Sequence, residues 1–443
     1  MRLRRVLIPA AILVMAVGAT GQQEWTLTDL GVLHPTGYSY SGDIDNLGRV
    51  TGTALAPNGL SEHAFLHDGT GMQDLGTLGS TYSWGHDIND SGTVVGYSNV
   101  NSLKLHAYSW ASGSMTDEHV GPLNFSRANG INAFGDVTGV TSQPGGFISD
   151  FLAYATIAGT TTVLPTFGGE EGHGKDINEL GQVVGYTRLA SGQLRGFLWD
   201  NGVMTDLGDL GDVLTIANAM NNSGQIVGHS RLPSGELHAF LWEAGVIMDL
   251  GTHGGRDSDA RDINAMGEIV GASDAADGTS RATIWSNGVA TDLNTFLPAG
   301  STWTLTGAGG INELGQISGT GRINGVKRAY RMDPVLAAPR MSGLAPPVAG
   351  QPSSIHVIGM TPLAPVFYVF GLVPGSLPIP VCVPGFTLGM TDPQLLSVGA
   401  ADATGRAQLD LVIPGAGAGL AVVLQVVDLA GCAASNTVHQ QIL

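Results

Sequence analysis

The chain has 443 residues, of which 66 are glycine, 13% are charged and 43% are hydrophobic, and its formal net charge is −18. Glycine occurs at about twice its usual share, whereas the apolar content suffices for a packed core and excludes a low-complexity disordered chain. Because phosphate backbones and anionic lipid surfaces attract lysine and arginine, this acidic balance argues against a nucleic-acid partner and against an anionic membrane surface.

The first 21 residues have the pattern of a secretory signal peptide. Arg2, Arg4 and Arg5 form a positive start, and an uncharged apolar run follows from Val6 to Ala19, which is short for a membrane span. We expect residues 1–21 to be removed, which would change the net charge from −18 to −21 because three arginines are lost. The mature protein is therefore expected to be secreted or held at the cell surface, without insertion into the membrane.

Seven repeats follow, and each carries two glycines four residues apart with a β-branched residue midway between them. The first glycines are spaced by 43 to 48 residues and lie at Gly48, Gly92, Gly135, Gly181, Gly224, Gly267 and Gly315. The second glycines are Gly52, Gly96, Gly139, Gly185, Gly228, Gly271 and Gly319. A turn residue lies three positions before each first glycine: Asp45 in the first repeat, then Asn89, Asn132, Asn178, Asn221, Asn264 and Asn312.

Each repeat is predicted to form four short strands, which is the content of one propeller blade. Residues 22–334 are therefore predicted to form an all-β, seven-bladed β-propeller. The first strand of each repeat carries a small residue such as Gly85, which crowding at the propeller axis would select. The last repeat stops after its third strand, Arg328–Met332, whereas the segment Trp25–Gly31 matches a fourth strand, so we expect the two to close the ring. A linear β-solenoid is the alternative, but it gives no reason for this split.

Several motifs recur in register from about Trp25 to Pro334. They include His63-Ala64-Phe65-Leu66, His238-Ala239-Phe240-Leu241-Trp242 and Met204-Thr205-Asp206-Leu207-Gly208. In these motifs the chain resembles the HAF family of bacterial extracellular repeats. The resemblance implies an exported repeat protein and brings no catalytic residues with it.

Residues 335–443 differ in composition, with no lysine or glutamate and with apolar runs between glycine and proline turns. This pattern predicts a small C-terminal β-sandwich. Both cysteines of the chain, Cys382 and Cys432, lie here, and in an exported protein they are predicted to form a disulfide. The segment Gly431-Cys432-Ala433-Ala434-Ser435-Asn436 resembles the end of small β-sandwich domains of exported bacterial proteins, which implies no activity.

The repeated asparagines offer oxygen atoms that could bind calcium, but calcium needs six to eight such ligands. We interpret each asparagine instead as the residue that caps its own turn. The recurrent His63, His106 and His238 are replaced by Arg195, Arg281 and Arg328 in other repeats, which argues against metal ligation or general-base chemistry. The sequence therefore predicts no metal site and no cofactor.

Four aromatic residues are candidates for ligand contact. Tyr82, Trp84 and His86 alternate along one predicted strand and share a face, on which a sugar could stack. Trp303, like Trp84, does not fall at the repeated tryptophan position. The competing interpretation is that these side chains pack between blades.

No catalytic motif with a nucleophile elbow, a phosphate-binding loop or a zinc-protease signature occurs, so no catalytic residue is predicted. We expect a secreted, monomeric, non-enzymatic binding or scaffold protein whose partner is an extracellular glycan or protein. Loops such as Gln143–Asp150 and Asp274–Thr279 would present the binding surface. One alternative is a carbohydrate-active hydrolase or lyase at the channel mouth. Another is a structural protein that the C-terminal module anchors to the cell surface.

Overall fold

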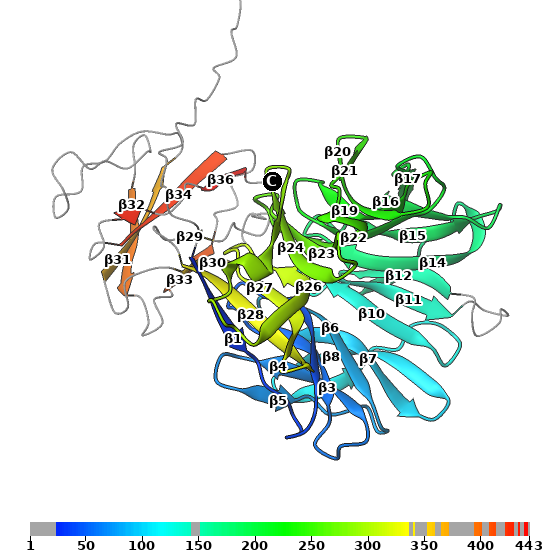
Figure 1. The fold of residues 1–443 in the computed structure, drawn as a ribbon, viewed down its shortest axis with the longest axis horizontal. Helices are drawn as coiled ribbons and strands as arrows, with labels where there is room; N and C mark the ends of the chain where they lie inside the picture. The colour runs from blue at the N-terminus through cyan, green and yellow to red at the C-terminus, as the bar shows by residue number, and fades with distance from the viewer. Residues whose placement is uncertain are drawn as a thin grey trace, which may run out of the picture.

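The computed structural model describes residues 24–142 and 151–335, and beyond them only the backbone of eight short strands between residues 340 and 441. Residues 24–335 form seven four-stranded antiparallel sheets, which follow one another in chain order around a ring (Figure 1). The predicted all-β, seven-bladed propeller is thereby confirmed. In this part of the chain the single helical element is the 3₁₀ turn η1 at Leu293–Phe296.

The first four blades each take four consecutive strands. Blade 1 contains β2 (Ser39–Ile44), β3 (Val50–Leu55), β4 (Glu62–His67) and β5 (Met72–Asp74). Blade 2 contains β6 (Ser83–Ile88), β7 (Val94–Asn101), β8 (Lys104–Ala111) and β9 (Ser114–Asp117). Blade 3 contains β10 (Ser126–Ile131), β11 (Val137–Ser142), β12 (Phe151–Ile157) and β13 (Thr160–Val163). Blade 4 contains β14 (Gly168–Ile177), β15 (Val183–Leu189), β16 (Leu194–Asp200) and β17 (Val203–Asp206).

Blades 5 and 6 also take four consecutive strands, whereas blade 7 combines strands from the two ends of the propeller sequence. Blade 5 contains β18 (Thr215–Met220), β19 (Ile226–Arg231), β20 (Leu237–Glu243) and β21 (Val246–Asp249). Blade 6 contains β22 (Gly254–Ile263), β23 (Ile269–Ala275), β24 (Ser280–Ser286) and β25 (Val289–Asp292). Blade 7 contains β26 (Trp303–Ile311), β27 (Ile317–Ile323) and β28 (Val326–Val335), and its fourth strand is β1 (Glu24–Asp29). The register runs from Glu24 opposite Val335 to Asp29 opposite Tyr330, so the N-terminal strand closes the ring as predicted (Figure 1).

Two kinds of tight turn join the strands of a blade. Between the first and second strands, the first glycine of every repeat has a positive φ, from +72° at Gly48 to +86° at Gly92, a conformation that glycine adopts without steric cost. Between the outer strands, pairs such as Asn201-Gly202 and Ala244-Gly245 both have positive φ, as two-residue type I′ hairpin turns require. The glycine excess of the sequence is thus concentrated at turns.

The second glycine of each repeat is required for a different reason. The first strand of every blade has a β-bulge, where the pairing with the second strand shifts by at least one residue, for example between Ala217 and Ala219 in blade 5. The bulge presses a carbonyl oxygen against the second glycine. A Cβ on Gly228 would lie 2.0 Å from the Ile216 oxygen, and a Cβ on Gly96 would lie 1.9 Å from the Trp84 oxygen.

The small residues of the first strands pack between blades, which corrects the expectation that crowding at the axis selects them. A Cβ on Gly85 would lie 2.5 Å from the Thr51 Oγ1 atom of the preceding blade, and a Cβ on Gly174 would lie 2.2 Å from Thr138 Oγ1. In other blades the position is a buried alanine, such as Ala217 or Ala260. The limit on size therefore comes from the neighbouring blade, and the axis itself has room for long side chains.

The C-terminal strands pair into two antiparallel sheets. One joins β29 (Arg340–Met341), β30 (Pro352–Ile358) and β33 (Ala407–Val412). The other joins β31 (Pro365–Gly371), β32 (Gln394–Ala400), β34 (Ala421–Asp428), β35 (Ala433–Ala434) and β36 (Val438–Gln441). The expected signal peptide, the Cys382–Cys432 disulfide and the loop 143–150 lie outside the described residues.

Candidate ligand-binding site

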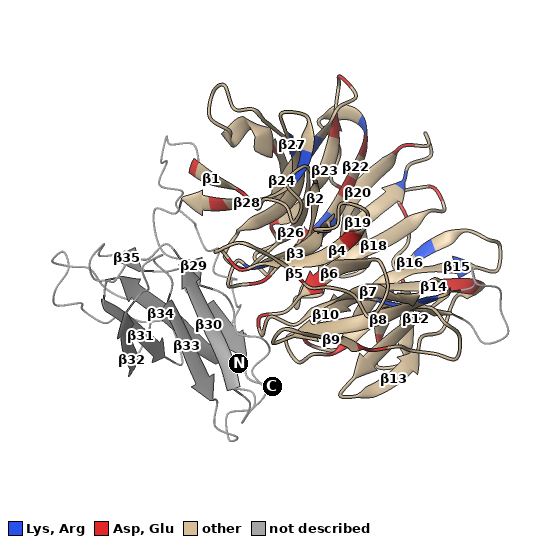
Figure 2. Ribbon diagram, turned by 90° about the horizontal axis from the view of Figure 1, so that it is seen from below, with Lys and Arg blue, Asp and Glu red and all other residues tan. Residues whose placement is uncertain are grey.

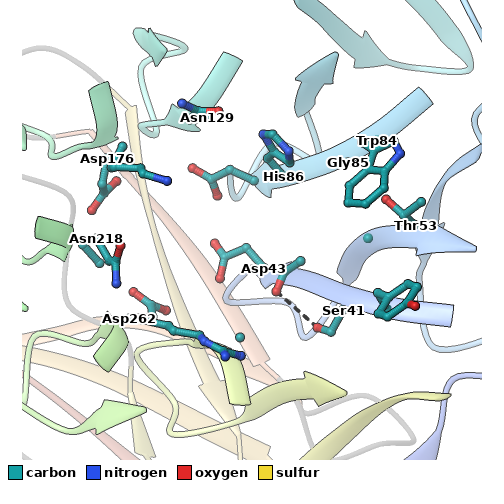
Figure 3. A pocket seen from close by; sticks show the side chains of 18 residues that line it. Ser41, Asp43, Thr53, Trp84, Gly85, His86, Asn129, Asp176, Asn218 and Asp262 are labelled. Atoms are coloured by element: carbon teal, nitrogen blue, oxygen red, sulfur yellow. Dashed lines mark hydrogen bonds between the residues drawn. The ribbon is translucent and has the colours of Figure 1, made fainter. Parts of the chain in front are cut away.

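A cavity of about 400 Å³ opens at one end of the propeller axis, and we call it the mouth cavity (Figure 3). The bulged residue of every first strand lines it. These seven residues, the bulge ring, are Gly42, His86, Asn129, Lys175, Asn218, Arg261 and Gly309. A bulge leaves one residue out of the ladder and redirects its side chain, and here it gives each blade one position at the cavity wall.

The bulge ring is uneven around the axis. Blades 7 and 1 contribute glycines because the next strand is too close: a Cβ on Gly309 would lie 2.7 Å from the Gly42 oxygen, and one on Gly42 would lie 2.8 Å from the His86 oxygen. Blades 2 to 6 contribute long polar side chains, and of these His86, Asn129 and Asn218 surround the same space as Asp43 in Figure 3, with Trp84 beyond His86 beside Thr53. The bulge ring is therefore small in blades 7 and 1, where Tyr40 also lines the cavity, and polar in blades 2 to 6, which we call the polar wall.

Below the bulge ring, four aspartates form a carboxylate ring. Asp43, Asp87, Asp176 and Asp262 line both the mouth cavity and a second cavity of about 180 Å³ further along the axis. Three of them fasten one blade to the next. Asp176, for example, accepts hydrogen bonds from its own neighbour Ile177 N at 2.7 Å and from Met220 N of the next blade at 2.8 Å. Asp87 and Asp262 accept the equivalent pairs.

Asp43 is the exception. The aspartates occupy alternate blades, and because the number of blades is odd, Asp43 and Asp87 fall on neighbouring blades. Each of the three fastening aspartates is followed, one blade later, by a small residue: Gly130, Ala219 or Gly310. Asp43 is followed by Asp87, so two carboxyl groups lie close together on neighbouring blades. Burial and the neighbouring carboxylates raise the pKa of Asp43 well above its usual range. Burial also raises the pKa of Asp176 to about 8, so the ring carries less negative charge at neutral pH than four free carboxylates would.

The repeated asparagines form a third tier. The Asn221 oxygen accepts from Ser223 N and Gln225 N of its own turn, while its Nδ2 donates to Asn264 O of the next blade at 3.1 Å. Other blades share this arrangement, with donation to the next blade from Asn89, Asn132, Asn264 and Asn312. Asp45 takes this place in blade 1, where Arg49 pairs with its carboxylate. Their oxygens are thus engaged with turns, and within residues 24–142 and 151–335 no three His, Asp or Glu side chains gather as ligands for one metal ion.

Charged and aromatic side chains lie on the polar wall or directly behind it. Burial, with Lys175 and Arg127 nearby, lowers the pKa of His86 to about 4, and its Nδ1–H donates to Ala128 O at 3.0 Å. Trp84 stacks on Tyr97 at 6.0 Å between ring centroids. Asn218 donates both amide hydrogens, to Asp259 Oδ1 and to Ala260 O, which leaves its oxygen as an acceptor at the cavity wall. This wall can therefore offer positive charge, hydrogen-bond acceptors and an aromatic face.

The structure brings together two of the four aromatic residues that the sequence singled out. Trp84 and His86 line the mouth cavity. Tyr82 lies outside its lining and is 37% exposed, and Trp303 packs edge-on against Tyr330 within blade 7. Sequence reasoning missed Asn129, Lys175, Asn218 and Arg261. A comparison across repeats could have found them, because the third position before the turn residue holds five residue types in seven blades, while the position before it is always a small residue.

The recurrent histidines lie away from the cavity and join the third strand of a blade to the fourth. His63 Nδ1 lies 2.9 Å from an Asp74 carboxylate oxygen, and His238 Nδ1 lies 2.9 Å from Asp249. His106 pairs with Asp117 in the same way. In blade 4 the equivalent residue is Arg195, which pairs with carboxylates of the same region.

No family model matches the chain, and no curated protein matches it significantly. Among solved structures, TolB from Acinetobacter baumannii matches with a TM-score of 0.38 and 12% identity over 57% of this chain, which spans 61% of TolB. A fungal alcohol oxidase of the AA5 family, in complex with copper, matches with a TM-score of 0.38 and 10% identity over 95% of this chain and 99% of its own. The acylaminoacyl peptidase of Pyrococcus horikoshii has a TM-score of 0.41 and 12% identity over 74% of this chain and 59% of its own. Likenesses at this level say nothing about the ligand of this chain.

The described residues contain no helix long and apolar enough to cross a membrane.

Proposed function

We propose that the mature protein is a secreted, non-enzymatic binding protein of the HAF-repeat type, whose ligand site is the mouth cavity. One observation carries the proposal. The tiers that hold the blades together repeat from blade to blade, whereas the bulge ring, which faces the cavity, presents His86, Asn129, Lys175, Asn218 and Arg261 in succession. A position freed from the repeat and directed into a cavity is where a rigid repeat scaffold places recognition.

A glycan is the ligand class that the wall suits best. Saccharides are bound by aromatic faces together with hydrogen-bonding amides and charged groups, and Trp84, Asn129 and Asn218 line one wall. The Trp84 ring is backed by Tyr97 and is held in place by this stacking. The turn at Asp274–Thr279, a candidate binding loop by sequence, is instead a compact turn closed by Ala275 N donating to Thr279 O at 2.9 Å. This favours the cavity over that loop.

The alternative, a carbohydrate-active enzyme, has one observation in its favour: burial and the neighbouring carboxylates raise the pKa of Asp43, which lines the mouth cavity, well above its usual range. Against it, both carboxylate oxygens of Asp87 already accept backbone N–H groups. Incubation with every glycan that binds distinguishes the two. Release of new sugar ends that is abolished in Asp43→Asn would establish the enzyme, whereas unchanged glycans would support the binding protein.

The C-terminal sheets are proposed to pack as the predicted β-sandwich, with the Cys382–Cys432 disulfide within it. This module would serve as a spacer or surface anchor. Deletion of residues 335–443 followed by cell fractionation tests the anchor, which requires the truncated protein to move to the medium.

A glycan array probed with residues 22–443 tests the proposal itself. We expect binding that Trp84→Ala lowers at least tenfold, the loss that removal of one sugar-stacking ring would produce, and that Tyr82→Ala leaves unchanged, since Tyr82 is close in sequence but outside the cavity. Asn218→Ala serves as a second cavity variant should Trp84→Ala lower the melting temperature. Binding that survives both cavity variants would refute the site.

A further inference from the structure

Lysine is rare in this protein, and one of its three lysines stands in the mouth cavity. Lys104 and Lys327 lie on outer strands β8 and β28, whereas Lys175 is the bulged residue of β14. Among the described residues no carboxylate lies within ion-pair distance of its Nζ, and no hydrogen-bond acceptor is in place. Its one close contact there is the Tyr186 ring, with Nζ 5.9 Å from the ring centroid.

The carboxylates near Lys175 are bound to other groups. Asp176, the next residue, has both oxygens bound to backbone N–H groups. Asp259 accepts from Asn218, lies 2.9 Å from His229 Nδ1 and pairs with Arg261. Burying a cation without a partner lowers the free energy of unfolding. A structural role for Lys175 does not explain why the protein buries its charge at this position.

Arg127 adds a second cation near Lys175, behind the residues that line the mouth cavity. Its guanidinium carbon lies 4.5 Å from the Tyr97 ring centroid and 5.0 Å from that of Phe125, and its Nε is buried with no hydrogen-bond partner in the described part of the chain. Burial lowers the pKa of Lys175, of His86 and of His173, and the nearby Arg127 lowers each of the three further. Blades 3 and 4 thus bring together two cations with no ion-pair partner in the described part of the chain, although Lys and Arg are sparse and Asp and Glu common over the propeller (Figure 2).

We propose that Lys175, assisted by Arg127, binds an acidic group of the ligand, so that the mouth cavity takes an acidic saccharide. The inference rests on the proposed function for the saccharide part. The Nζ of Lys175 supplies the hydrogen-bonded positive charge that a sugar carboxylate or sulfate requires. Trp84 offers a face for the sugar ring, and the oxygen of Asn218 accepts from a hydroxyl. The small residues of blades 7 and 1 leave space for the rest of the chain of sugars.

The positions of Trp84 and Lys175 set the geometry of recognition. Trp84 lies on blade 2 and Lys175 on blade 4, and between them on blade 3 the Arg127 guanidinium lies over the Tyr97 ring on which Trp84 also stacks. The ligand is therefore expected to reach across blade 3, with its stacked ring at Trp84 and its acidic group at Lys175. A neutral glycan would leave Lys175 unpaired in the filled cavity, which binding penalises.

The test compares carboxylated, sulfated and neutral glycans on one array, followed by titration of trigalacturonate and its methyl ester, which differ in charge but share a backbone. Four proteins of residues 22–443 are used: wild type, Lys175→Met, Lys175→Arg and, as a matched lysine control, Lys104→Met. We expect acidic glycans to bind, Lys175→Met to weaken them at least tenfold, and Lys175→Arg to retain part of the affinity. Lys104→Met should have no effect.

The carboxylated and sulfated arms identify which acid is preferred. Neutral glycans that bind in the mouth cavity and are unaffected by Lys175→Met would overturn the acidic-ligand inference and leave the proposed function standing. Absence of binding to every glycan would overturn both. Because Lys175→Met replaces a buried unpaired charge with a side chain of similar length, it should fold, and a melting temperature equal to or above that of the wild type confirms that the comparison concerns binding.

Discussion

Replacing the two glycines of a repeat by alanine is predicted to destabilise the protein for different physical reasons. In blade 5 these two reasons can be measured separately. Gly224 has a φ of +78° and open space around an added Cβ. Gly224→Ala therefore meets backbone strain alone, and a left-handed conformation costs an L-residue about 1–2 kcal/mol. A Cβ on Gly228 would lie 2.0 Å from the Ile216 oxygen, and ordinary contact begins at 3.4 Å, so the two paired strands must move apart by about 1.4 Å.

The larger loss is expected at Gly228. Overpacking costs about 1–3 kcal/mol, and one or two ladder hydrogen bonds add about 1 kcal/mol each, which gives roughly 2–5 kcal/mol for Gly228→Ala. In a domain of about 300 residues, each kcal/mol lowers the melting temperature by about 1.5 °C, so calorimetry should find a fall of roughly 3–8 °C for Gly228→Ala and 2–3 °C for Gly224→Ala.

Gly71 provides the control for both variants. It has ordinary backbone angles and nothing within 4 Å of an added Cβ. Gly71→Ala should therefore be neutral or slightly stabilising, since alanine restricts the unfolded chain more than glycine does. Equal losses at Gly224 and Gly228, or a loss at Gly71 as large as either, would refute the account of the bulge.

Three further predictions concern the buried carboxyl groups near the propeller axis, the asparagine that links one blade to the next, and the strand that closes the ring. Burial raises the pKa of Asp176 to about 8 and the pKa values of Glu179 and Glu313 to about 7. Between the unfolded pKa values of about 4 and these folded values, the folded state binds more protons than the unfolded state. Urea denaturation should therefore show the stability contributed by these groups falling from about pH 4 to about pH 8 and levelling off above it. A flat profile would contradict this, and Glu313→Gln should reduce the slope. Asn221→Asp removes two donated hydrogen bonds and should lower the free energy of unfolding by about 2–3 kcal/mol. Adding Gln225→Arg copies the Asp45–Arg49 pair of blade 1 and should restore more than half of this loss in a double-mutant cycle. Strictly additive effects of the two substitutions would argue against the copied pair. Deletion of residues 24–31 removes β1 and should lower the melting temperature by 10 °C or more, and a synthetic peptide of those residues should restore it; a deletion without effect would show that closure does not need β1.

Sequence reasoning reached the propeller because its signals are local and repeated seven times. The glycine at the turn, Gly224, and the β-branched residue that follows it, Ile226, can both be recognised within one repeat. The incomplete last repeat predicted that its missing fourth strand, β1, would come from the N-terminus. It placed Trp84 and His86 at a ligand site by their shared face, and the structure puts both at the mouth cavity.

The remainder of the site depended on features that no local pattern reveals. Lys175 points into the cavity because a bulge shifts the pairing of β14 by one residue, and simple alternation does not predict such a shift. The absence of a partner for Lys175 follows from Asp176 and Asp259 being engaged by groups from other blades. Gly85 is small because Thr51 lies against it, and a contact between two blades cannot be inferred within one repeat.

The central claim is that the ligand binds at the mouth of the channel, and a crystal structure of residues 22–443 with the tightest-binding glycan from the array tests it most directly. The account predicts a sugar ring against Trp84 with an acidic group within hydrogen-bonding distance of Lys175 Nζ. A glycan bound on an outer loop or on the C-terminal module, with the mouth cavity empty, would contradict it.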